Sequence, residues 1–171
     1  MKHPMRRAKR QIDDFEALAL LRQCTWGVLS TVGPDGLPYG VPLNYCLDER
    51  PAGGGSKDGK TERVLIFHAA PEGRKLDNLR HCASAAFVAV AADELVPDKY
   101  TTFYASVMAS GPVRIVEEPD AKRASLFKLV AALAPVHPDL GAAHIEKWLD
   151  GCVVLELVIE ELSGKKRPRK E

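Results

Sequence analysis

Apolar, β-branched and aromatic residues gather in six short stretches of the chain, each bounded by turn-forming residues. Stretches of this length and composition are typical of β-strands. The first two are separated by Gly-Pro-Asp-Gly at 33–36, a sequence that favours a tight hairpin turn. The predicted strands are 25–32, 37–47, 63–69, 84–92, 101–116 and 152–160.

Apolar residues at helical spacing predict helices over 12–23, 74–82, 118–133 and 142–149. Asp13 or Asp14 can cap the first helix, whose apolar positions are Phe15, Leu18 and Leu21 with Ala19, and Pro119 suits the first turn of the third. No regular alternation of helices and strands is present, which argues against a parallel, doubly wound sheet. The pattern therefore predicts a mainly β protein, a small antiparallel barrel flanked by helices.

Glycine and proline residues indicate where two of the predicted strands lie at an edge or are interrupted. Pro38 and Pro42 lie inside the return strand 37–47 and cannot donate to a ladder, so this strand is expected at a sheet edge or broken by a bulge. Its backbone groups are then free to meet something other than a neighbouring strand. The stretch 101–116 is too long for one straight strand, and Gly111-Pro112 is expected to mark its bulge or kink.

Two segments are expected to be exposed and irregular. Residues 48–62 form a glycine-rich, flexible hairpin loop that lacks the spacing of a phosphate loop. The tail 164–171 is basic, as solvated and disordered chain ends often are.

Length and charge limit the class of partner. The 171 residues suit a single domain, and the net charge of +1 gives no global field that would attract nucleic acid or a membrane. The basic start leads into Asp13 and Asp14 rather than an apolar stretch, so neither a signal peptide nor a membrane span is expected. A small-molecule partner fits this balance best.

Cysteine and histidine spacing does not predict a metal site. The four cysteines, at 24, 46, 82 and 152, form no C-x-x-C pair, and the five histidines form no H-E-x-x-H set. Reduced thiols in a cytoplasmic protein are the simplest interpretation. A serine hydrolase elbow is also missing, so any chemistry is expected to come from a cofactor.

The predicted helix start after strand 63–69 carries two cations, Arg74 and Lys75. Cations are unfavourable in a first helical turn, where the macrodipole is positive, unless an anion offsets them. A phosphate would suit both the free N–H groups and the side chains. A solvated turn that happens to carry two cations is the alternative, and the segment by itself does not decide between the two.

Four segments carry a resemblance to a known family: 26–31 (WGVLST), 36–45 (GLPYGVPLNY), 67–78 (FHAAPEGRKLDN) and 101–111 (TTFYASVMASG). In order and spacing they resemble the pyridoxamine 5'-phosphate oxidase-like FMN-binding split-barrel proteins, and within them the nitroimidazole-resistance (Nim) group. The glycine-rich insert at 52–59 and Ala105 depart from the pattern, and Ala105 leaves substrate choice open. The resemblance implies a six-stranded antiparallel split barrel that forms a homodimer with two FMN molecules at the subunit interface.

The resemblance also assigns roles to particular residues. Arg74 and Lys75 would hold the FMN phosphate, with hydroxyl donors from Ser30 and Thr31. The flavin ring would run along Pro42, Leu43 and Asn44, and its open side, where a substrate stacks, would be lined by His68, Tyr104 and Ser106. Of these only His68 is a catalytic candidate.

Each of these residues also has a purely structural interpretation. Ser30 and Thr31 can simply end a strand, His68 can be hydrogen-bonded at the rim of a core, and Tyr104 can be barrel wall.

The expected function is that of an FMN-dependent oxidoreductase, which reduces a small electron-poor organic compound with reduced nicotinamide, NAD(P)H, as donor. A non-enzymatic carrier of a flavin or haem-type ligand, built on the same fold, is the alternative. Nucleic-acid binding through the basic residues 165–170 is a third and weaker hypothesis.

Overall fold

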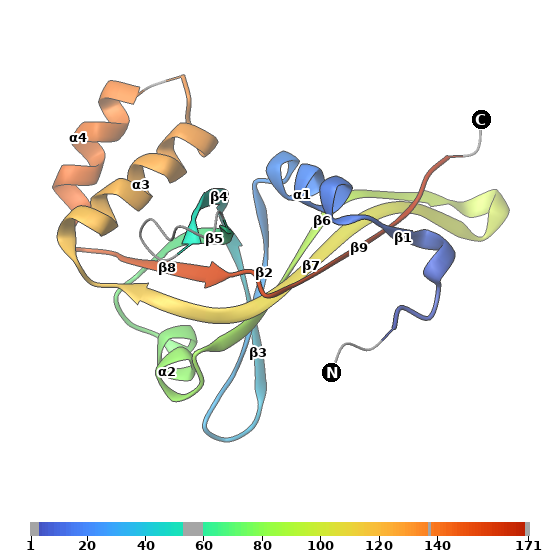
Figure 1. Ribbon diagram of the computed structural model, residues 1–171, viewed down its shortest axis with the longest axis horizontal. Coiled ribbons are helices and arrows are strands. Elements are labelled where there is room, and N and C mark those ends of the chain that lie inside the picture. The colour runs from blue at the N-terminus through green and yellow to red at the C-terminus, as the bar shows by residue number, and fades with distance from the viewer. Residues whose placement is uncertain (1–3, 53–59, 137, 170–171) are drawn as a thin grey trace.

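One connected antiparallel sheet carries the fold (Figure 1). The computed structural model describes residues 4–52, 60–136 and 138–169. Along the main path of the sheet the strand order is β3-β2-β6-β7-β8-β5-β4, and β9 pairs with both β7 and β1. The strands are β1 (Gln11–Ile12), β2 (Trp26–Val32), β3 (Pro38–Asn44), β4 (Cys46–Pro51), β5 (Thr61–Ala69), β6 (Ser84–Val96), β7 (Thr101–Val116), β8 (Val153–Val158) and β9 (Glu161–Arg167).

Four α-helices flank the sheet, and α3 and α4 lie side by side at one end of the molecule (Figure 1). Side chains at their starts stabilise two of them: Asp13 accepts the N–H of Glu16 at 2.8 Å, and Glu118 accepts two N–H groups of α3. None of the described helices is long and apolar enough to cross a membrane. The helices are α1 (Asp14–Gln23), α2 (Arg74–His81), α3 (Pro119–Leu133) and α4 (Pro138–Trp148), with short 3-10 turns η1 (Ala8–Arg10) and η3 (Pro97–Lys99).

The architecture confirms the predicted fold class, an antiparallel split β-barrel with flanking helices. The strand count rises from six to nine for two reasons. The predicted return strand 37–47 is in fact two strands, and β9 with its short partner β1 occupies segments where no strand was predicted.

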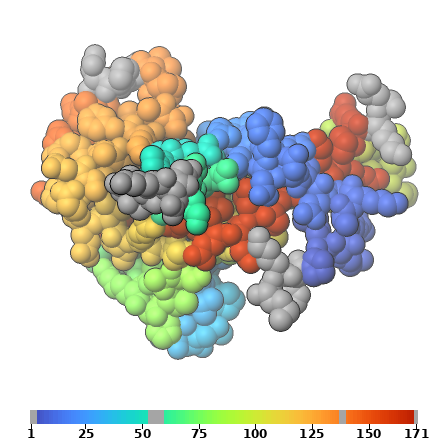
Figure 2. All heavy atoms as spheres, in the orientation of Figure 1, coloured from blue at the N-terminus to red at the C-terminus, as the bar shows by residue number. Residues whose placement is uncertain are grey.

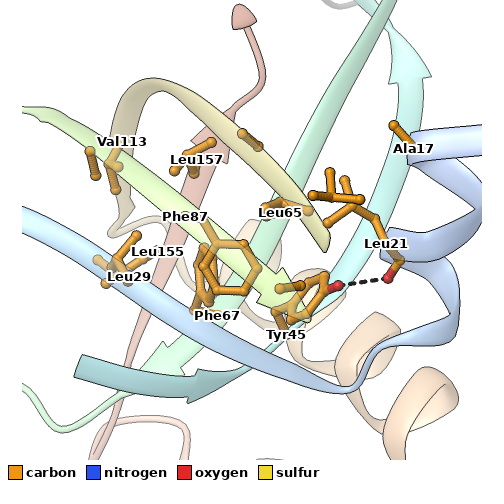
Figure 3. Packing of buried hydrophobic residues seen from close by; sticks show 14 of the residues in the cluster. Ala17, Leu21, Leu29, Tyr45, Leu65, Phe67, Phe87, Val113, Leu155 and Leu157 are labelled. Atoms are coloured by element: carbon orange, nitrogen blue, oxygen red, sulfur yellow. Dashed lines mark hydrogen bonds between the residues drawn. The ribbon is translucent and has the colours of Figure 1, made fainter. Parts of the chain in front are cut away.

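The barrel interior is filled by an aromatic cluster (Figure 3). Tyr45, Phe67 and Phe87 are almost fully buried, and the ring centroids of Tyr45 and Phe87 lie 4.7 Å apart in an edge-to-face arrangement. The Tyr45 hydroxyl donates to the carbonyl oxygen of Leu21 at 2.7 Å, which ties α1 to the barrel, and burial raises the pKa of this phenol. A second apolar cluster, which includes Ile66 and Leu129, fills the space between the sheet and the α3–α4 pair.

The break between β3 and β4 falls at Tyr45 and corrects the single predicted strand 37–47. Here the side chain of Tyr45 lies in the core, and its N–H donates to the Thr25 carbonyl at 3.2 Å, in register with the β2–β3 pairs; the next residue, Cys46, already pairs with Ile66 of β5. Beyond it, β4 pairs with β5 as far as Pro51 opposite Thr61, so much of the predicted loop 48–62 is hairpin strand. Residues 53–59 of that loop lie outside the described residues.

The basic tail also differs from its prediction as a disordered end. Its first part belongs to β9, which pairs with β7 from Ser110–Glu161 to Tyr104–Arg167. Two contacts explain the order: buried Gly164 lies against Ile12 of β1, and Lys166 forms an ion pair with Glu16 of α1. Residues 170–171 lie outside the described residues.

Gly111 is the point at which β7 changes partners, from β9 on one side of it to β8 on the other. A Cβ atom there would lie 2.0 Å from the carbonyl oxygen of Val158, so only glycine permits this approach. Pairing with β6 is regular through Gly111 and Pro112, and the register shift lies instead between Val90 and Ala92 of β6. The prediction of a bulge at Gly111-Pro112 is therefore wrong, and these residues mark the change of strand partner instead.

Smaller differences concern element ends and two side chains. Strand 84–92 extends to Val96, the fourth helix begins at Pro138 rather than Ala142, and the last predicted strand is shorter. Phe15, at 81%, and Ala19 are exposed although their spacing placed them on the apolar face of α1, where Ala17, Leu18 and Leu21 are buried.

A buried ion pair joins β4 to β8 beneath α3. The Arg50 guanidinium donates two hydrogen bonds to the Glu156 carboxylate, at 3.0 and 2.5 Å, and Ser125 Oγ of α3 adds a third at 3.3 Å. Glu156 is only 5% exposed. Arg50 also contacts Glu62, whose pKa is lowered by the hydrogen bond from Arg114 and then by Arg50. Each partner therefore offsets a charge that would be costly alone.

Replacing Arg50 by Met is expected to lower the free energy of unfolding by about 3 kcal/mol, because it leaves the buried Glu156 carboxylate without its cation. Urea denaturation measures this loss. The double variant Arg50→Met/Glu156→Leu should recover most of it, and Arg169→Met, which breaks a fully exposed pair with Glu94, should leave the urea midpoint almost unchanged. Equal losses for Arg50→Met and Arg169→Met would contradict the account.

Candidate functional site

Five of the ten predicted site residues lie on one face of the sheet. Directly opposed residues in an antiparallel sheet share a face, and two printed rows of pairs define this one: Pro42–Val28–Val88–Met108–Ser163 and Gly40–Ser30–Ala86–Ser110–Glu161. Asn44, Ser106 and Tyr104 follow at steps of two along β3 and β7, so they join the same face. We call it the outer sheet face, because the alternate residues, such as Leu29 and Phe87, fill the barrel.

Ser30 and Thr31 point to opposite sides of β2, because successive side chains alternate in a strand. Ser30 is half-buried on the outer sheet face, with Gly40 beside it. Thr31 is 1% exposed and faces inward, where its hydroxyl accepts from Asn78 Nδ2 at 3.0 Å and donates to the Tyr39 carbonyl at 3.4 Å. The structure thus separates the two predicted hydroxyl donors, and that of Thr31 is engaged in holding α2 on β2.

The start of α2 has the features that an anion site needs. Gly73 precedes the helix with φ of +117°, a conformation that favours glycine, and it offers no capping side chain. Backbone hydrogen bonds to the Gly73 carbonyl occupy the N–H groups of Leu76 and Asp77. In the described part of the chain, the N–H groups of Arg74 and Lys75 have no backbone acceptor, as expected for a helix start.

The two cations of this first turn differ in their surroundings. Arg74 is stacked 5.1 Å from the Tyr39 ring centroid and approaches Asp35 of the β2–β3 turn at 3.8 Å. Lys75 is half-buried, and among the described residues it forms no ion pair. The predicted helix start is confirmed, and the cation that the macrodipole disfavours is Lys75 more than Arg74.

β3 is an edge strand, as its prolines predict, because it ends the main path of the sheet and pairs with β2 alone. Pro42 and Asn44 are exposed on the outer sheet face, and Asn44 Nδ2 donates to the Thr25 carbonyl at 3.0 Å. Leu43 lies between them on the inner side, packed against the core. Pro42 and Asn44 are thus the members of this trio that can meet a ligand on the face.

His68 lies away from the outer sheet face. It stands opposite Val154, at the end of β5, and lines an apolar cavity of about 210 Å³ between the sheet and the α3–α4 pair. His144, Trp148 and Cys152 border the same cavity. The His144 and Trp148 ring centroids are 6.2 Å apart.

One chain does not bring His68 to Tyr104 and Ser106. Val154 pairs with Val116, at the far end of β7, which is twelve residues from Tyr104, or roughly 40 Å along the strand at about 3.3 Å per residue. Tyr104 is instead beside Arg10, whose Nη1 donates to its hydroxyl at 3.2 Å. If these residues belong to one ligand site, a second copy of the chain has to supply some of them.

Sequence reasoning missed two groups of residues around the site. Asn78 is 2% exposed and fixes α2 to β2 through its hydrogen bond to Thr31. Its place in the sequence between the buried Leu76 and Leu79 could have indicated a buried polar contact. Trp26, Val90 and Met108 are each more than half exposed on or beside the outer sheet face. The sequence shows that these residues alternate with other apolar ones, but it does not show which of the two sheet faces stays exposed in the folded chain.

Comparisons with known proteins agree with this geometry. The profile of the pyridoxamine 5'-phosphate oxidase family matches residues 13–166. No curated protein sequence matches the chain.

Among solved structures, the flavocytochrome Anf3 from Azotobacter vinelandii is 19% identical, with a TM-score of 0.73 over 98% of this chain and 73% of its own. The FAD and heme binding protein from Mycobacterium smegmatis is 22% identical, with a TM-score of 0.69 over 95% and 77%. A Bacteroides thetaiotaomicron protein named for 5-nitroimidazole antibiotic resistance is 19% identical, with a TM-score of 0.65 over 91% and 85%. At these identities the three structures share the fold with this chain.

Replacing Thr31 by Val is expected to lower the free energy of unfolding by about 1 to 3 kcal/mol, because the buried Asn78 amide loses its acceptor. Ser30→Ala, one residue away on the other face, should change it by no more than about 0.5 kcal/mol. Urea denaturation of both variants measures the difference. Equal destabilisation would show that the two hydroxyls do not differ in structural role.

Proposed function

The chain belongs to the pyridoxamine 5'-phosphate oxidase family, and from this premise we propose that it is a homodimer that binds FMN. Its reaction passes electrons from reduced nicotinamide, NAD(P)H, to a small electron-poor organic compound. The observation that carries the proposal is the start of α2: among the described residues Lys75 has no acidic partner, and the N–H groups of Arg74 and Lys75 have no backbone acceptor.

The residues at this helix start suit a phosphate. The N–H groups of Arg74 and Lys75 and the Lys75 ammonium are all donors, and an anion there would offset the unfavourable placement of the cation. The space beside Gly73 is open to a ligand, since even a Cβ atom built at this position would have no neighbouring atom within 4 Å. Asn78 anchors the helix by its buried bond to Thr31, so the donors are held on a fixed element.

The flavin ring has a neighbouring surface in the outer sheet face. Ser30 lies on this face in β2, the strand to which α2 is anchored, and the exposed positions of β3, Pro42 and Asn44, flank it. Because β3 is an edge strand and its prolines lack an N–H, its backbone is free of a further strand partner in the described structure. The flavin supplies the electron-transfer chemistry, and the residues of the chain bind it, orient it and shape the space above it.

The dimer is supported by the apolar part of the outer sheet face. Trp26, Val90 and Met108 are 58%, 55% and 55% exposed, and Val28 and Val88 lie between them, which makes an apolar surface across three strands. Surfaces of this kind mark association sites. A two-fold dimer across it would also bring Tyr104 and Ser106 of one chain toward the α2 end of the other.

A carrier of a flavin or other small ligand is the second candidate. The cavity beside His68 and His144 favours it, and two structural relatives are named for haem or flavocytochrome content. Its volume of about 210 Å³ is below the usual range for cofactor pockets, so it suits a single small ring. Steady oxidation of NAD(P)H with a nitroaromatic acceptor separates the two functions, because a carrier would bind flavin without turnover.

Lys75→Glu is expected to weaken FMN binding at least tenfold, because it removes a charge-assisted contact of about 1.5 to 3 kcal/mol and adds repulsion. The melting temperature of the flavin-free variant should stay level or rise slightly, since Glu suits a helix start. Titration calorimetry with FMN and with riboflavin measures the two affinities, and that for riboflavin should change little. Thermal unfolding of the flavin-free protein measures the melting temperature.

Arg80→Glu is the matched control for Lys75→Glu, because it makes the same change in charge at the other end of α2, where Arg80 pairs with Asp77. FMN affinity in this variant should remain within about twofold of the parent. Unaltered FMN binding in Lys75→Glu, or riboflavin bound by the parent as tightly as FMN, would remove the phosphate from this helix.

Met108→Asp is expected to convert the dimer to a monomer, because it places a charge in the centre of the apolar surface, and to weaken flavin binding at the same time. Light scattering and absorbance titration measure the two effects. Phe15→Asp on α1 introduces the same charge at a more exposed apolar residue away from this face, and it should leave both unchanged. A monomeric parent that binds FMN fully would show that one chain holds the complete site.

A further inference from the structure

The strongest unexplained feature of the molecule is a cluster of cations around Tyr104, where η1 and β9 meet the long β6–β7 hairpin. Arg10 Nη1 donates to the Tyr104 hydroxyl at 3.2 Å, and its guanidinium carbon lies 5.9 Å from the ring centroid. Lys165 Nζ lies 5.5 Å from the same centroid. Arg167, opposite Tyr104 in β9, lies 5.9 Å from the Phe103 ring instead and stays outside this group. We call Arg10 and Lys165, gathered at the Tyr104 ring, the Tyr104 cluster.

The two cations of the cluster have no ion-pair partner among the described residues, whereas their neighbours do. Lys166 pairs with Glu16 and Arg169 with Glu94, so the nearby carboxylates are used on other cations. Asp93 stands opposite Tyr104 on β6, but among the described residues it forms no ion pair with a cation of the cluster. The cluster therefore keeps an excess of positive charge.

The Tyr104 ring holds both side chains in place. A cation over the face of an aromatic ring is attracted by the ring's quadrupole, and the hydrogen bond to Tyr104 orients Arg10 further. The concentration of cations is strong enough to lower the pKa of Tyr104, first through the Arg10 hydrogen bond and then through the charges of Arg10, Lys165 and Arg7. Like charges gathered in this way repel one another, and an anion between them relieves that repulsion.

We propose that the Tyr104 cluster is an anion site for the phosphate or diphosphate group of a small molecule, built from other residues than the start of α2 and separate from it within one chain. Planar guanidinium groups and an ammonium are the side chains that bind phosphate oxygens best. A phosphate monoester carries about −1.5 to −2 charges at neutral pH, which matches the excess of the cluster better than a carboxylate does.

The position of the cluster explains why sequence alone did not indicate it. Arg10 and Lys165 are 155 residues apart, and they meet because β9 pairs with both β1 and β7. Figure 2 shows the N-terminal segment in blue and β9 in red side by side at the end of the molecule away from α3 and α4. A charge run that reads as a solvated tail is therefore one wall of a site.

Isothermal titration calorimetry tests the proposal on the full chain with whatever flavin it carries. Sodium orthophosphate, sodium pyrophosphate and ADP are titrated separately, at low and at physiological ionic strength. Saturable binding of at least one of them at one site per chain is expected, tighter at low salt. The ranking of orthophosphate against pyrophosphate identifies the group that the site takes.

Two adjacent lysines of β9 provide a matched pair of variants. Lys165→Gln should weaken the binding at least tenfold, because it removes a cation of the cluster, whereas Lys166→Gln makes the same charge change on the Glu16 side and should weaken it less than twofold. Arg10→Gln should reproduce the effect of Lys165→Gln, and circular dichroism verifies that each variant is folded.

Several outcomes would overturn the proposal. Equal effects of Lys165→Gln and Lys166→Gln would reduce it to general charge attraction, and loss of binding in Lys75→Glu alone would move the anion to α2. A change of oligomeric state in Lys165→Gln without anion binding would assign the cluster to a subunit contact. Binding to a single-stranded oligonucleotide with none to the three small anions would assign it to nucleic acid. Failure of FMN binding in the parent would not affect these readouts.

Discussion

The shape of the molecule depends on the partner change of β7 at Gly111. On one side of this residue β7 pairs with β9, on the other it pairs with β8, and the carbonyl oxygen of Val158 comes too close for any side chain at that position. The barrel closes on the β8 side, whereas on the β9 side β6 and β7 extend beyond it (Figure 1). As a result, residues at the two ends of β7 belong to different environments in one chain.

This division determines what a single chain can hold. Ser30 and the edge strand β3 lie at one end of the outer sheet face, and Tyr104 with its cations lies at the other. The cationic start of α2 is held at the same end as Ser30, but through Thr31 and Tyr39, whose side chains point to the opposite side of β2 and β3. The apolar residues Trp26, Val90 and Met108 occupy the region between these ends. A two-fold assembly that covers the apolar region would bring a polar end of one chain near the opposite polar end of its partner. Residues of both chains could then line one site.

The parts of the fold that local chemistry determines could be predicted from sequence. Asp13 does cap the first helix and Pro119 does lie in the first turn of α3, although the first helix begins at Asp14 rather than at residue 12. The prolines of β3 predicted an edge strand, and the cations at 74 and 75 do lie in a first turn. What depends on distant partners could not be predicted. The basic tail becomes β9 only because Gly164 finds Ile12, and Tyr45 breaks a strand only because the barrel has room for its ring. The same limit applies to the site: an alternation of side chains predicts two faces for Ser30 and Thr31, but not which face is covered.

The prolines of β3 have a consequence for how copies of this protein meet. An exposed strand edge is a template on which another chain can add a strand, and uncontrolled addition leads to aggregation. Pro38 and Pro42 remove two donors from the outermost strand, so its edge cannot offer a continuous ladder to a newcomer. Contact between copies is thereby directed to the broad surface of the sheet, where side chains rather than backbone groups select the partner. The two prolines that deprive the β3 edge of donors thus also disfavour the strand-by-strand addition through which copies of a chain build fibres.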